Sequence, residues 1–266
     1  MELKLGDTCF VLNNGSRDGT ALLVEKFSQL NDFCRLVNID VGDKANAWNV
    51  FVHEMGVEAD IFYFVDGDCE VVDGAIDALE ECIFKNPTAN AAAALPSSKV
   101  SPKFREMMIK QGGLAGNLYA LPRNFVERIK INNIRLPLGL IGDDSLLGAL
   151  ACWDLDPTST WDKTKIVTCQ SANFSYVPFS LFSFKDISLY LRRKIRYSLR
   201  RFQTNLMKKP LKERGLSAIP KDIVDVYKNY HSQIKIEWRG IDTMFDLLAA
   251  RMIKKVVYQT SHSLPE

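Results

Sequence analysis

The chain of 266 residues is predicted to form an α/β fold, in which helices flank a mostly parallel β-sheet. Helical and strand-like patterns alternate along its first half. Polar, glycine-containing segments follow two of the predicted strands. Because ligands bind outside the carboxyl ends of the strands in open parallel sheets, these segments also indicate where a site lies.

The first elements are predicted as strand, helix, strand and helix. A short apolar strand at 8–12 leads into the turn-rich sequence Asn-Asn-Gly-Ser-Arg-Asp-Gly-Thr at 13–20. Helical periodicity begins at Ala21. A strand at 33–39 and a helix at 44–55 follow, so the turn-rich loop lies between a strand end and a helix start.

The next predicted strand, at 60–65, ends in two acidic residues. Its apolar run is followed by Asp66, Gly67 and Asp68. Two carboxylates at a strand tip offer the oxygen ligands that Mg²⁺ or Mn²⁺ prefers, and the glycine lets the backbone turn sharply. The pattern therefore favours a metal bound to phosphates, with an ordinary acidic turn as the alternative.

The second half of the chain becomes helical and basic. The remaining elements are predicted as helices near 72–84 and 102–110, a strand at 91–95, short strands at 165–170 and 173–178, a long helix from Ile187 to Leu206 broken by Pro210 and Gly215, and helices at 221–236 and 241–257. We divide the chain into a catalytic domain at 1–155, lacking its usual N-terminal part, and a basic, mainly helical region at 156–266.

Charge is unevenly distributed along the sequence. The net charge is +2, but residues 185–221 hold 12 Lys and Arg against two acidic residues, which leaves −8 for the rest. The long helix is amphipathic, with arginines between its apolar positions. It is either a solvated surface or the contact for an anionic partner such as a diphosphate, lipid headgroup or nucleic acid.

Composition places the chain among globular proteins of the cytoplasm. It is 47% hydrophobic and 25% charged, with no apolar run of membrane-spanning length and no signal-peptide pattern. Its six cysteines are scattered without a Cys-x-x-Cys pair. We expect reduced core cysteines, and neither a zinc site nor disulfides.

Four segments, read together, resemble a known family. They are Asn13–Thr20, Asp43–Asn49, Tyr63–Asp68 and Leu140–Leu147. Their order and spacing are similar to those of the family 2 glycosyltransferases, inverting enzymes with the GT-A fold. The resemblance covers roughly residues 8 to 150.

This resemblance implies a nucleotide-sugar site. Asn13 or Asn14 takes the position that contacts the nucleotide base, in the same loop as Ser16 and Asp18. The donor-binding segment that starts at Lys44 and includes Asn49 is also implied, with Asp43 in place of the usual glycine. Asp66 and Asp68 match the Asp-x-Asp pair that binds the ribose of the nucleotide and, through Mg²⁺ or Mn²⁺, its diphosphate.

Asp143 and Asp144 match the later acidic pair of the family, whose second member is the catalytic base. Inverting transfer needs a carboxylate to take the acceptor proton and a countercharge on the departing diphosphate. Asp144 and the metal would supply these. The stretch Gly112–Asn117 resembles the family's acceptor-side segment. The alternative for the acidic pair is helix N-capping.

The segment Arg193–Tyr197 is similar to the Gln-x-x-Arg-Trp element of processive synthases, with Arg and Tyr replacing Gln and Trp. We expect Arg193 and Arg196 to form a basic wall near the diphosphate, with plain surface charge as the alternative. Processivity is not expected, because those synthases need membrane-spanning helices.

The resemblance fails at the N-terminus. Family members begin with a strand and a helix that here have no counterpart before residue 8. That strand is central, between the strands ending at Asn13 and Asp66. We therefore expect a gap with unpaired backbone groups.

The predicted function is transfer of a hexosyl group from a nucleotide-diphosphate donor, UDP-linked by family habit, to a glycan or lipid-linked saccharide in polysaccharide biosynthesis. An anionic membrane surface at the cytoplasmic face is a further expected partner, and nucleic acid is not. One alternative is a non-catalytic subunit for nucleotide-sugar binding or membrane docking. A phosphatase with an Asp-x-Asp nucleophile is disfavoured because Cys69 and Glu70 follow the acidic pair.

Overall fold

The computed structural model describes residues 4, 6–177 and 184–262, which form two separate sheets. The smaller sheet pairs β1 (Cys9–Asn14) with β2 (Cys34–Ile39) in parallel. The larger sheet has the order β3 (Ile61–Val65), β6 (Leu118–Pro122), β5 (Ala91–Pro96), β7 (Ile166–Ser175) and β4 (Glu70–Val71). The α/β class predicted from the sequence is confirmed.

The larger sheet is mixed, so the expectation of a mostly parallel sheet is wrong for it. β6 runs antiparallel to both β3 and β5, and β4 runs antiparallel to β7, while β5 and β7 are parallel. The sequence analysis missed β6, and it split β7 into two strands. Because β7 pairs with β5, the sheet extends beyond residue 155, where we placed the domain boundary.

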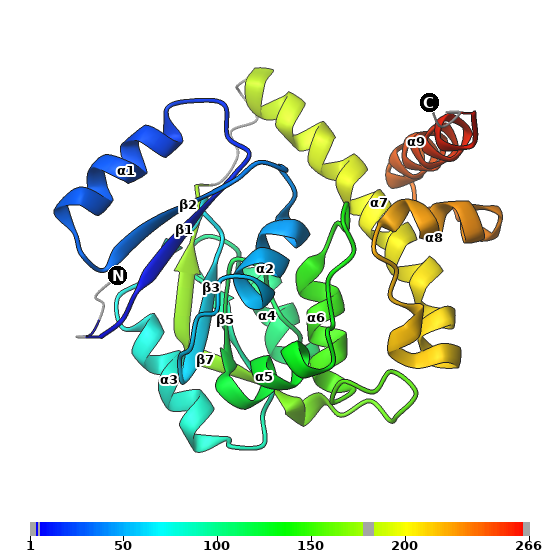
Figure 1. The fold of residues 1–266 in the computed structure, drawn as a ribbon. Helices are drawn as coiled ribbons and strands as arrows, with labels where there is room; N and C mark the ends of the chain where they lie inside the picture. Colours follow the sequence, from blue (N-terminus) through cyan, green and yellow to red (C-terminus); the bar gives the residue numbers. More distant parts are fainter. Residues whose placement is uncertain (1–3, 5, 178–183, 263–266) are drawn as a thin grey trace.

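Helices surround both sheets (Figure 1). Those of the first part are α1 (Thr20–Leu30), α2 (Lys44–His53), α3 (Ala75–Lys85), α4 (Pro102–Gln111), α5 (Arg123–Ile131) and α6 (Asp143–Cys152). The C-terminal helices are α7 (Phe184–Arg214), α8 (Ile223–Tyr230) and α9 (Asp242–His262). Figure 1 shows α1 outside the β1–β2 sheet and α7 to α9 at the other side of the molecule.

The core lies around the middle of the larger sheet. All six residues of β5 and four of the five residues of β6 are buried. The run of alanines at 91–94 leaves little side-chain volume on β5, so helices can pack closely on both of its faces. This packing gives the ends of β3 and β6 a firm support.

The long helix α7 has two different halves. Ile187 and Leu191 in its first half are exposed, whereas Leu199, Phe202 and Leu206 in its second half are buried. The apolar stripe of this helix is a candidate for membrane contact in the sequence. Beyond residue 198, however, the stripe is buried within the protein. The expected break at Pro210 is also wrong, because the helix continues to Arg214 and ends before Gly215.

A buried carboxylate joins α7 to α9. Asp246 is fully buried and lies 2.8 Å from Arg201 Nη2 and 3.3 Å from Arg239 Nη1. A buried charge without such partners would strongly destabilise the fold. Arg201 therefore fixes α9 against α7, and Arg239 ties α9 to the segment that precedes it.

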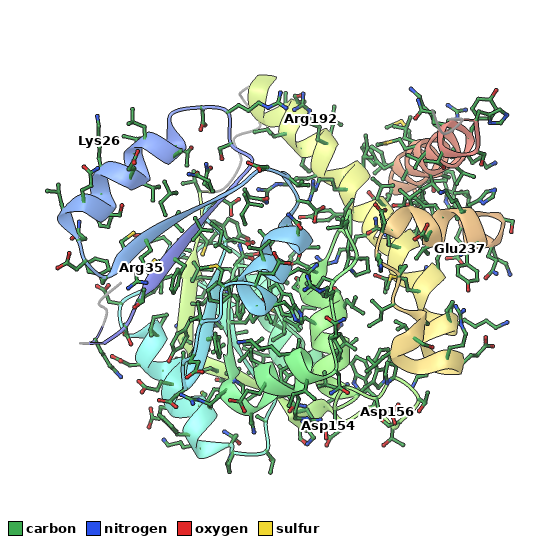
Figure 2. The ribbon with its side chains drawn as sticks, viewed as in Figure 1. Lys26, Arg35, Asp154, Asp156, Arg192 and Glu237 are labelled. Atoms are coloured by element: carbon green, nitrogen blue, oxygen red, sulfur yellow. The ribbon has the colours of Figure 1, made fainter. Side chains whose placement is uncertain are left out.

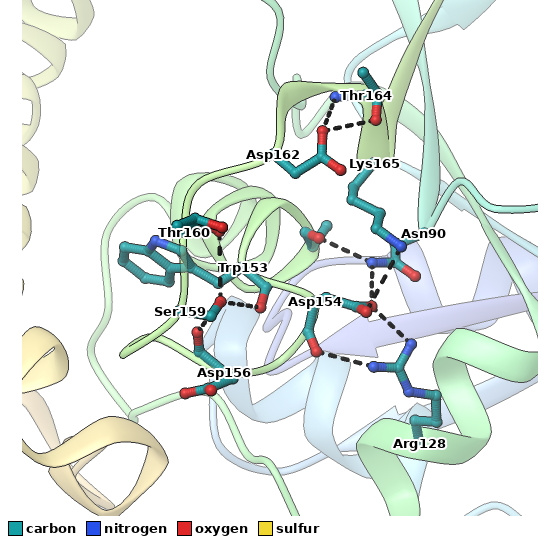
Figure 3. A network of polar contacts seen from close by, with 11 residues as sticks. Asn90, Arg128, Trp153, Asp154, Asp156, Ser159, Thr160, Asp162, Thr164 and Lys165 are labelled. Atoms are coloured by element: carbon teal, nitrogen blue, oxygen red, sulfur yellow. Dashed lines mark hydrogen bonds and ion pairs between the residues drawn. The ribbon is translucent and has the colours of Figure 1, made fainter.

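A polar network surrounds Asp154, just after the end of α6 (Figure 3). Asp154 accepts hydrogen bonds from Asn90 at 3.0 Å and Arg128 at 2.8 Å, and Lys165 lies 3.6 Å from it. The hydrogen bond from Asn90, followed by that from Arg128, lowers the pKa of Asp154. The network ties the starts of β5 and β7 to α5 and the end of α6.

Candidate active site

Lys44, the first residue of α2, brings two acidic groups together. Its Nζ lies 2.6 Å from Asp66 Oδ1, just past the end of β3, and 3.5 Å from Asp143 Oδ2, at the start of α6. The acidic pair after β3 and the acidic pair of α6, which are far apart in the sequence, thus share one site. This convergence agrees with the sequence prediction.

Gly116 lets these groups approach one another. A Cβ atom at this position would lie 3.0 Å from Lys44 Nζ, 3.6 Å from Asp66 Oδ2 and 3.7 Å from the Cβ of Asp144. Its N–H also donates a hydrogen bond to Asp144 Oδ2 at 3.2 Å. A side chain here would push the lysine away, so the glycine stretch is part of the site itself.

Asp144 is held from three sides. Besides Gly116, the N–H of Ser145 donates to Asp144 Oδ1 at 2.9 Å, and Arg200 Nη2 lies 3.0 Å from the same oxygen. The residue is buried, yet it does not cap α6, since the capping position is Gly142 and no side chain caps the helix there. The alternative role of Asp144 as the N-cap of α6 is therefore wrong.

Gly142 makes room for Arg200. Its φ of 96° lies in the left-handed region, and a Cβ atom there would lie 2.5 Å from Arg200 Nε. Both the backbone conformation and the space therefore require glycine. Arg200 also bonds the hydroxyl of Ser145.

Burial and charge oppose each other in this cluster. Burial raises the pKa of Asp143, and Lys44 only partly offsets this. The pKa of Asp66 is raised for the same reason, again against Lys44. Burial alone would lower the pKa of Lys44, but Asp143 and Asp66 outweigh it and the pKa is raised. The lysine therefore stays charged and stabilises the carboxylates as anions.

Asp68 has a more open setting than Asp66. Its side chain is 70% exposed, and Arg193 Nη2 from α7 lies 3.5 Å from its carboxylate. Arg196, one turn further along α7, is exposed. Arg193 thus lies beside the acidic pair.

The loop after β1 packs on the start of α2. Gly15 has a φ of 67°, and a Cβ atom there would lie 2.8 Å from the Cα of Gly42. Asn14 Oδ1 accepts a hydrogen bond from the N–H of Asp43 at 2.9 Å. Asp43 in turn caps α2 through the N–H of Asn46 and binds the N–H of Gly139. Asp43 therefore has a structural role at the start of α2.

Four other residues of the implied donor site differ in their surroundings. Asn13 is buried and donates to Asn38, but its own Oδ1 has no hydrogen-bond partner among the described residues. Ser16 and Asp18 lie at the surface, and Asp18 binds Thr20. Asn49 is buried away from this loop.

Asn49 clamps the backbone of Leu136 with both ends of its amide. Its Nδ2 donates to the carbonyl at 2.8 Å, and its Oδ1 accepts from the N–H at 2.8 Å. In the structure Asn49 thus holds the segment that leads to α6.

The sequence analysis missed Arg200 and Gln203. Gln203 is buried, accepts from the N–H of Ile141 at 2.7 Å and donates to the carbonyl of Gly139 at 3.2 Å. Both residues connect α7 to the segment before Asp144. The only signal was a basic amphipathic helix, and nothing in its pattern shows which turn faces the acidic pair.

The donor set suits a hard divalent cation held jointly with a ligand. Among the described residues, no three or more acidic, His or Cys side chains are grouped to hold a metal. Asp66 and Asp68 supply two carboxylates at one strand tip. Mg²⁺ commonly binds through one or two carboxylates together with substrate phosphates, so this pair fits that mode.

In the part of the chain that the structure describes, we find no helix with the length and apolar character needed to cross a membrane. The six cysteines are all free.

Comparison with solved structures shows the kind of fold. A mannosyltransferase from Pyrobaculum calidifontis, PcManGT, solved with GDP-Man and Mn²⁺, shares the fold with a TM-score of 0.57 at 17% identity, over 97% of this chain and 67% of that one. TarS of S. aureus, solved with UDP-GlcNAc, gives a TM-score of 0.46 at 14% identity, over 95% and 83% of the two chains. The fold is the GT-A fold of glycosyltransferases.

The sequence defines the class of protein. Residues 3–138 match the family described as Glycosyl transferase family 2. The chain therefore belongs to glycosyl transferase family 2, and it is a glycosyltransferase, as the motifs predicted. Comparison with curated protein sequences gives no match.

Proposed function

We propose that this nucleotide-sugar glycosyltransferase is an inverting enzyme that uses a UDP-linked hexose, with Asp144 as the general base. The observation that carries the proposal is the grouping of Asp66, Lys44 and Asp144 around Gly116. A donor bound at Asp66 would have its sugar next to a buried carboxylate. The proposed acceptor is a glycan or a lipid-linked saccharide.

Asp144 has the setting that a base requires. The N–H groups of Gly116 and Ser145 hold its carboxylate in one orientation. An acceptor hydroxyl that reaches it transfers its proton as the oxygen attacks the anomeric carbon and the bond to the diphosphate breaks. Asp143 lies beside Lys44 and stabilises the positive charge of the lysine. In this proposal Asp143 does not take the proton of the acceptor.

On the donor side, Asp66 and Asp68 would hold Mg²⁺ or Mn²⁺. When bound, this ion supplies positive charge to the departing diphosphate. Lys44, Arg193 and Arg196 add cationic charge on the same side. The structure of PcManGT contains Mn²⁺ and GDP-Man, which supports a bound metal in this chain. Because that donor is GDP-linked, the choice between uracil and guanine as the nucleobase is left to experiment.

The buried, unpartnered Oδ1 of Asn13 supports base recognition near the end of β1. An unpaired buried acceptor is costly, and an N–H of a nucleobase could satisfy it. Asn14, Ser16 and Asp18 lie in the same loop and would border the nucleoside.

A donor screen tests this proposal directly. The purified chain is incubated with UDP- and GDP-linked sugars and Mn²⁺ or Mg²⁺, and nucleotide diphosphate release is measured. Titration calorimetry with Asp68→Ala should show loss of metal-dependent donor binding. Unchanged metal-dependent affinity in this variant would contradict the metal assignment, and binding without turnover by the parent chain would favour the non-catalytic alternative.

We also propose contact with an anionic membrane at the cytoplasmic face, restricted to the first half of α7. There Ile187, Leu191 and Tyr197 are exposed, and Arg192 projects from the same half (Figure 2). Basic residues near a charged surface contribute up to about 1 kcal/mol each. Sedimentation with anionic and neutral vesicles is the measurement, and equal binding to both, or binding to neither, contradicts this contact.

A further inference from the structure

The outer face of α9 presents apolar and basic side chains together. Figure 1 shows α9 on the outer side of α7, at the periphery of the molecule. Its exposed large apolar residues are Met244, Leu247, Leu248, Met252 and Tyr258. Its exposed basic residues are Arg251, Lys254 and Lys255. At about 3.6 residues per turn, all of these side chains project from one half of the helix.

The acidic residues of α9 lie on its opposite face. Asp246 is fully buried against Arg201, and Asp242 Oδ1 lies 2.9 Å from Lys194 Nζ of α7. No other acidic residue occurs in the helix, all of which the structure describes. The exposed face therefore carries positive charge from three side chains and no negative charge.

The segment before α9 extends this surface. Trp238 is 86% exposed and Ile241 is 75% exposed, and Ile236 is exposed as well. Lys235 and Glu237 in the same segment balance each other in charge. The indole of tryptophan combines an apolar ring with a polar N–H, which suits a boundary between apolar and aqueous surroundings.

The combination of side chains indicates what kind of partner covers this face. A contiguous patch of exposed apolar residues marks an interaction surface. Nucleic acid would meet the basic residues but leave the apolar ones in water. A second copy of the chain would bring further basic residues to the same face, because a twofold interface joins identical patches. An anionic lipid surface accommodates both kinds of side chain, since apolar groups enter the headgroup boundary while basic groups meet phosphate.

The start of α9 lies beside the half of α7 that we proposed for membrane contact. The ion pair between Lys194 and Asp242 joins the first half of α7 to the first turn of α9. The two surfaces are therefore neighbours. Each is nevertheless built from its own residues, so one contact can fail without the other.

We propose that α9 and residues 236–241 dock on an anionic lipid surface. Trp238, Met244 and Leu248 enter the headgroup boundary, and Arg251 and Lys255 meet the lipid phosphates. The helix lies in the plane of the interface, because basic residues interrupt its apolar positions. This inference extends the membrane contact proposed for α7 and does not depend on transferase activity.

The emission of Trp238 reports this contact directly. Trp48 and Trp153 are buried and Trp161 is 49% exposed, so the variant Trp161→Phe leaves Trp238 as the exposed tryptophan. This variant is mixed with phosphatidylcholine vesicles that contain or lack phosphatidylglycerol. We expect a blue shift of the emission, and quenching by brominated acyl chains, only with the anionic vesicles.

Removal of charge from the face tests its role. Arg251→Gln combined with Lys255→Gln should weaken binding to anionic vesicles about tenfold or more, because each basic residue near a charged surface adds to the attraction. The matched control is Lys103→Gln combined with Lys110→Gln, which removes two exposed basic residues from α4 and should leave binding nearly unchanged. Vesicle sedimentation measures both.

Three results would overturn the proposal. The first is an unchanged Trp238 emission with anionic vesicles, and the second is equal binding to neutral and anionic vesicles. The third is a dimer in sedimentation velocity that Met244→Gln and Leu248→Gln dissociate, without vesicle binding, since a second copy would then cover the face. If Arg192→Gln abolishes sedimentation while the α9 pair does not, the membrane contact belongs to α7 alone and the role of α9 is refuted.

Discussion

The two sheets of this glycosyltransferase differ in how well they are covered. β5 and β6 are almost wholly buried, whereas β1 has one buried residue, Asn13, and α1 beside it has none. Of the carboxylates proposed for metal binding and catalysis, Asp66 follows β3 of the larger sheet and Asp144 is buried, although Asp68 is itself 70% exposed. We call this part of the molecule the covered side. The loop proposed for the nucleobase follows β1 of the smaller sheet, which we call the open side.

This difference suggests that the two regions have different roles. Elements with few buried contacts open locally at low free-energy cost, and a ligand that binds across them stabilises the closed form. We expect donor binding to stabilise the β1–β2 sheet against local opening, while the site around Asp144 needs no such stabilisation. Substitutions on the two sides should then affect different steps.

The largest expected effect is on turnover. Asp144→Asn keeps the size of the side chain but cannot take a proton, so transfer should slow by about 10²- to 10⁴-fold with donor affinity nearly unchanged. Asn13→Ala, on the open side, should instead weaken donor binding. Steady-state kinetics and donor titration measure both. A turnover of Asp144→Asn within a few-fold of the parent would place the base elsewhere.

The second effect concerns stability. Leu121→Ala removes a fully buried side chain of β6 and should cost about 2 to 5 kcal/mol. Leu23→Ala, on α1, removes a side chain that is 69% exposed and should change stability by less than about 0.5 kcal/mol. Denaturant unfolding compares them. A large loss for Leu23→Ala would mean that something covers α1 in solution.

Much of the fold could be predicted because its patterns are local. The apolar run of β3, the helix start at Lys44 and the helical periodicity of α9 each follow from nearby residues. β6 was missed because five residues, Leu118–Pro122, carry no period that separates a strand from a helix. The break predicted at Pro210 is absent, because the tertiary packing of α7 outweighs the free-energy cost of a proline inside a helix.

The candidate site was predicted from sequence motifs. Residues that reach the site from distant parts of the chain could not be predicted in this way. Asp66, Lys44 and Asp144 lie together as expected. Arg200 and Gln203 reach the site from α7, more than 50 residues after Asp144. Only the fold shows that these two side chains, and not their neighbours, face the acidic pair.

The smallest expected effect tests whether α7 contributes to turnover together with the carboxylates of the covered side. Arg200 contacts Asp144, and a charge-assisted hydrogen bond contributes about 1.5 to 3 kcal/mol, so Arg200→Gln should lower turnover by about tenfold or more. Arg192→Gln, on the exposed first half of the same helix, is the matched control and should leave turnover unchanged. Arg200 acts here as a positioning residue for the base.

A charge-conserving variant separates this role from a merely structural one. Arg200 Nη2 lies 3.0 Å from the carboxylate of Asp144, so loss of the guanidinium should lower kcat while the affinity for the donor stays nearly unchanged. Arg200→Lys keeps the charge and should restore most of the parent turnover. If Arg200→Lys is as slow as Arg200→Gln, the arginine only supports packing. The covered side would then end at α6.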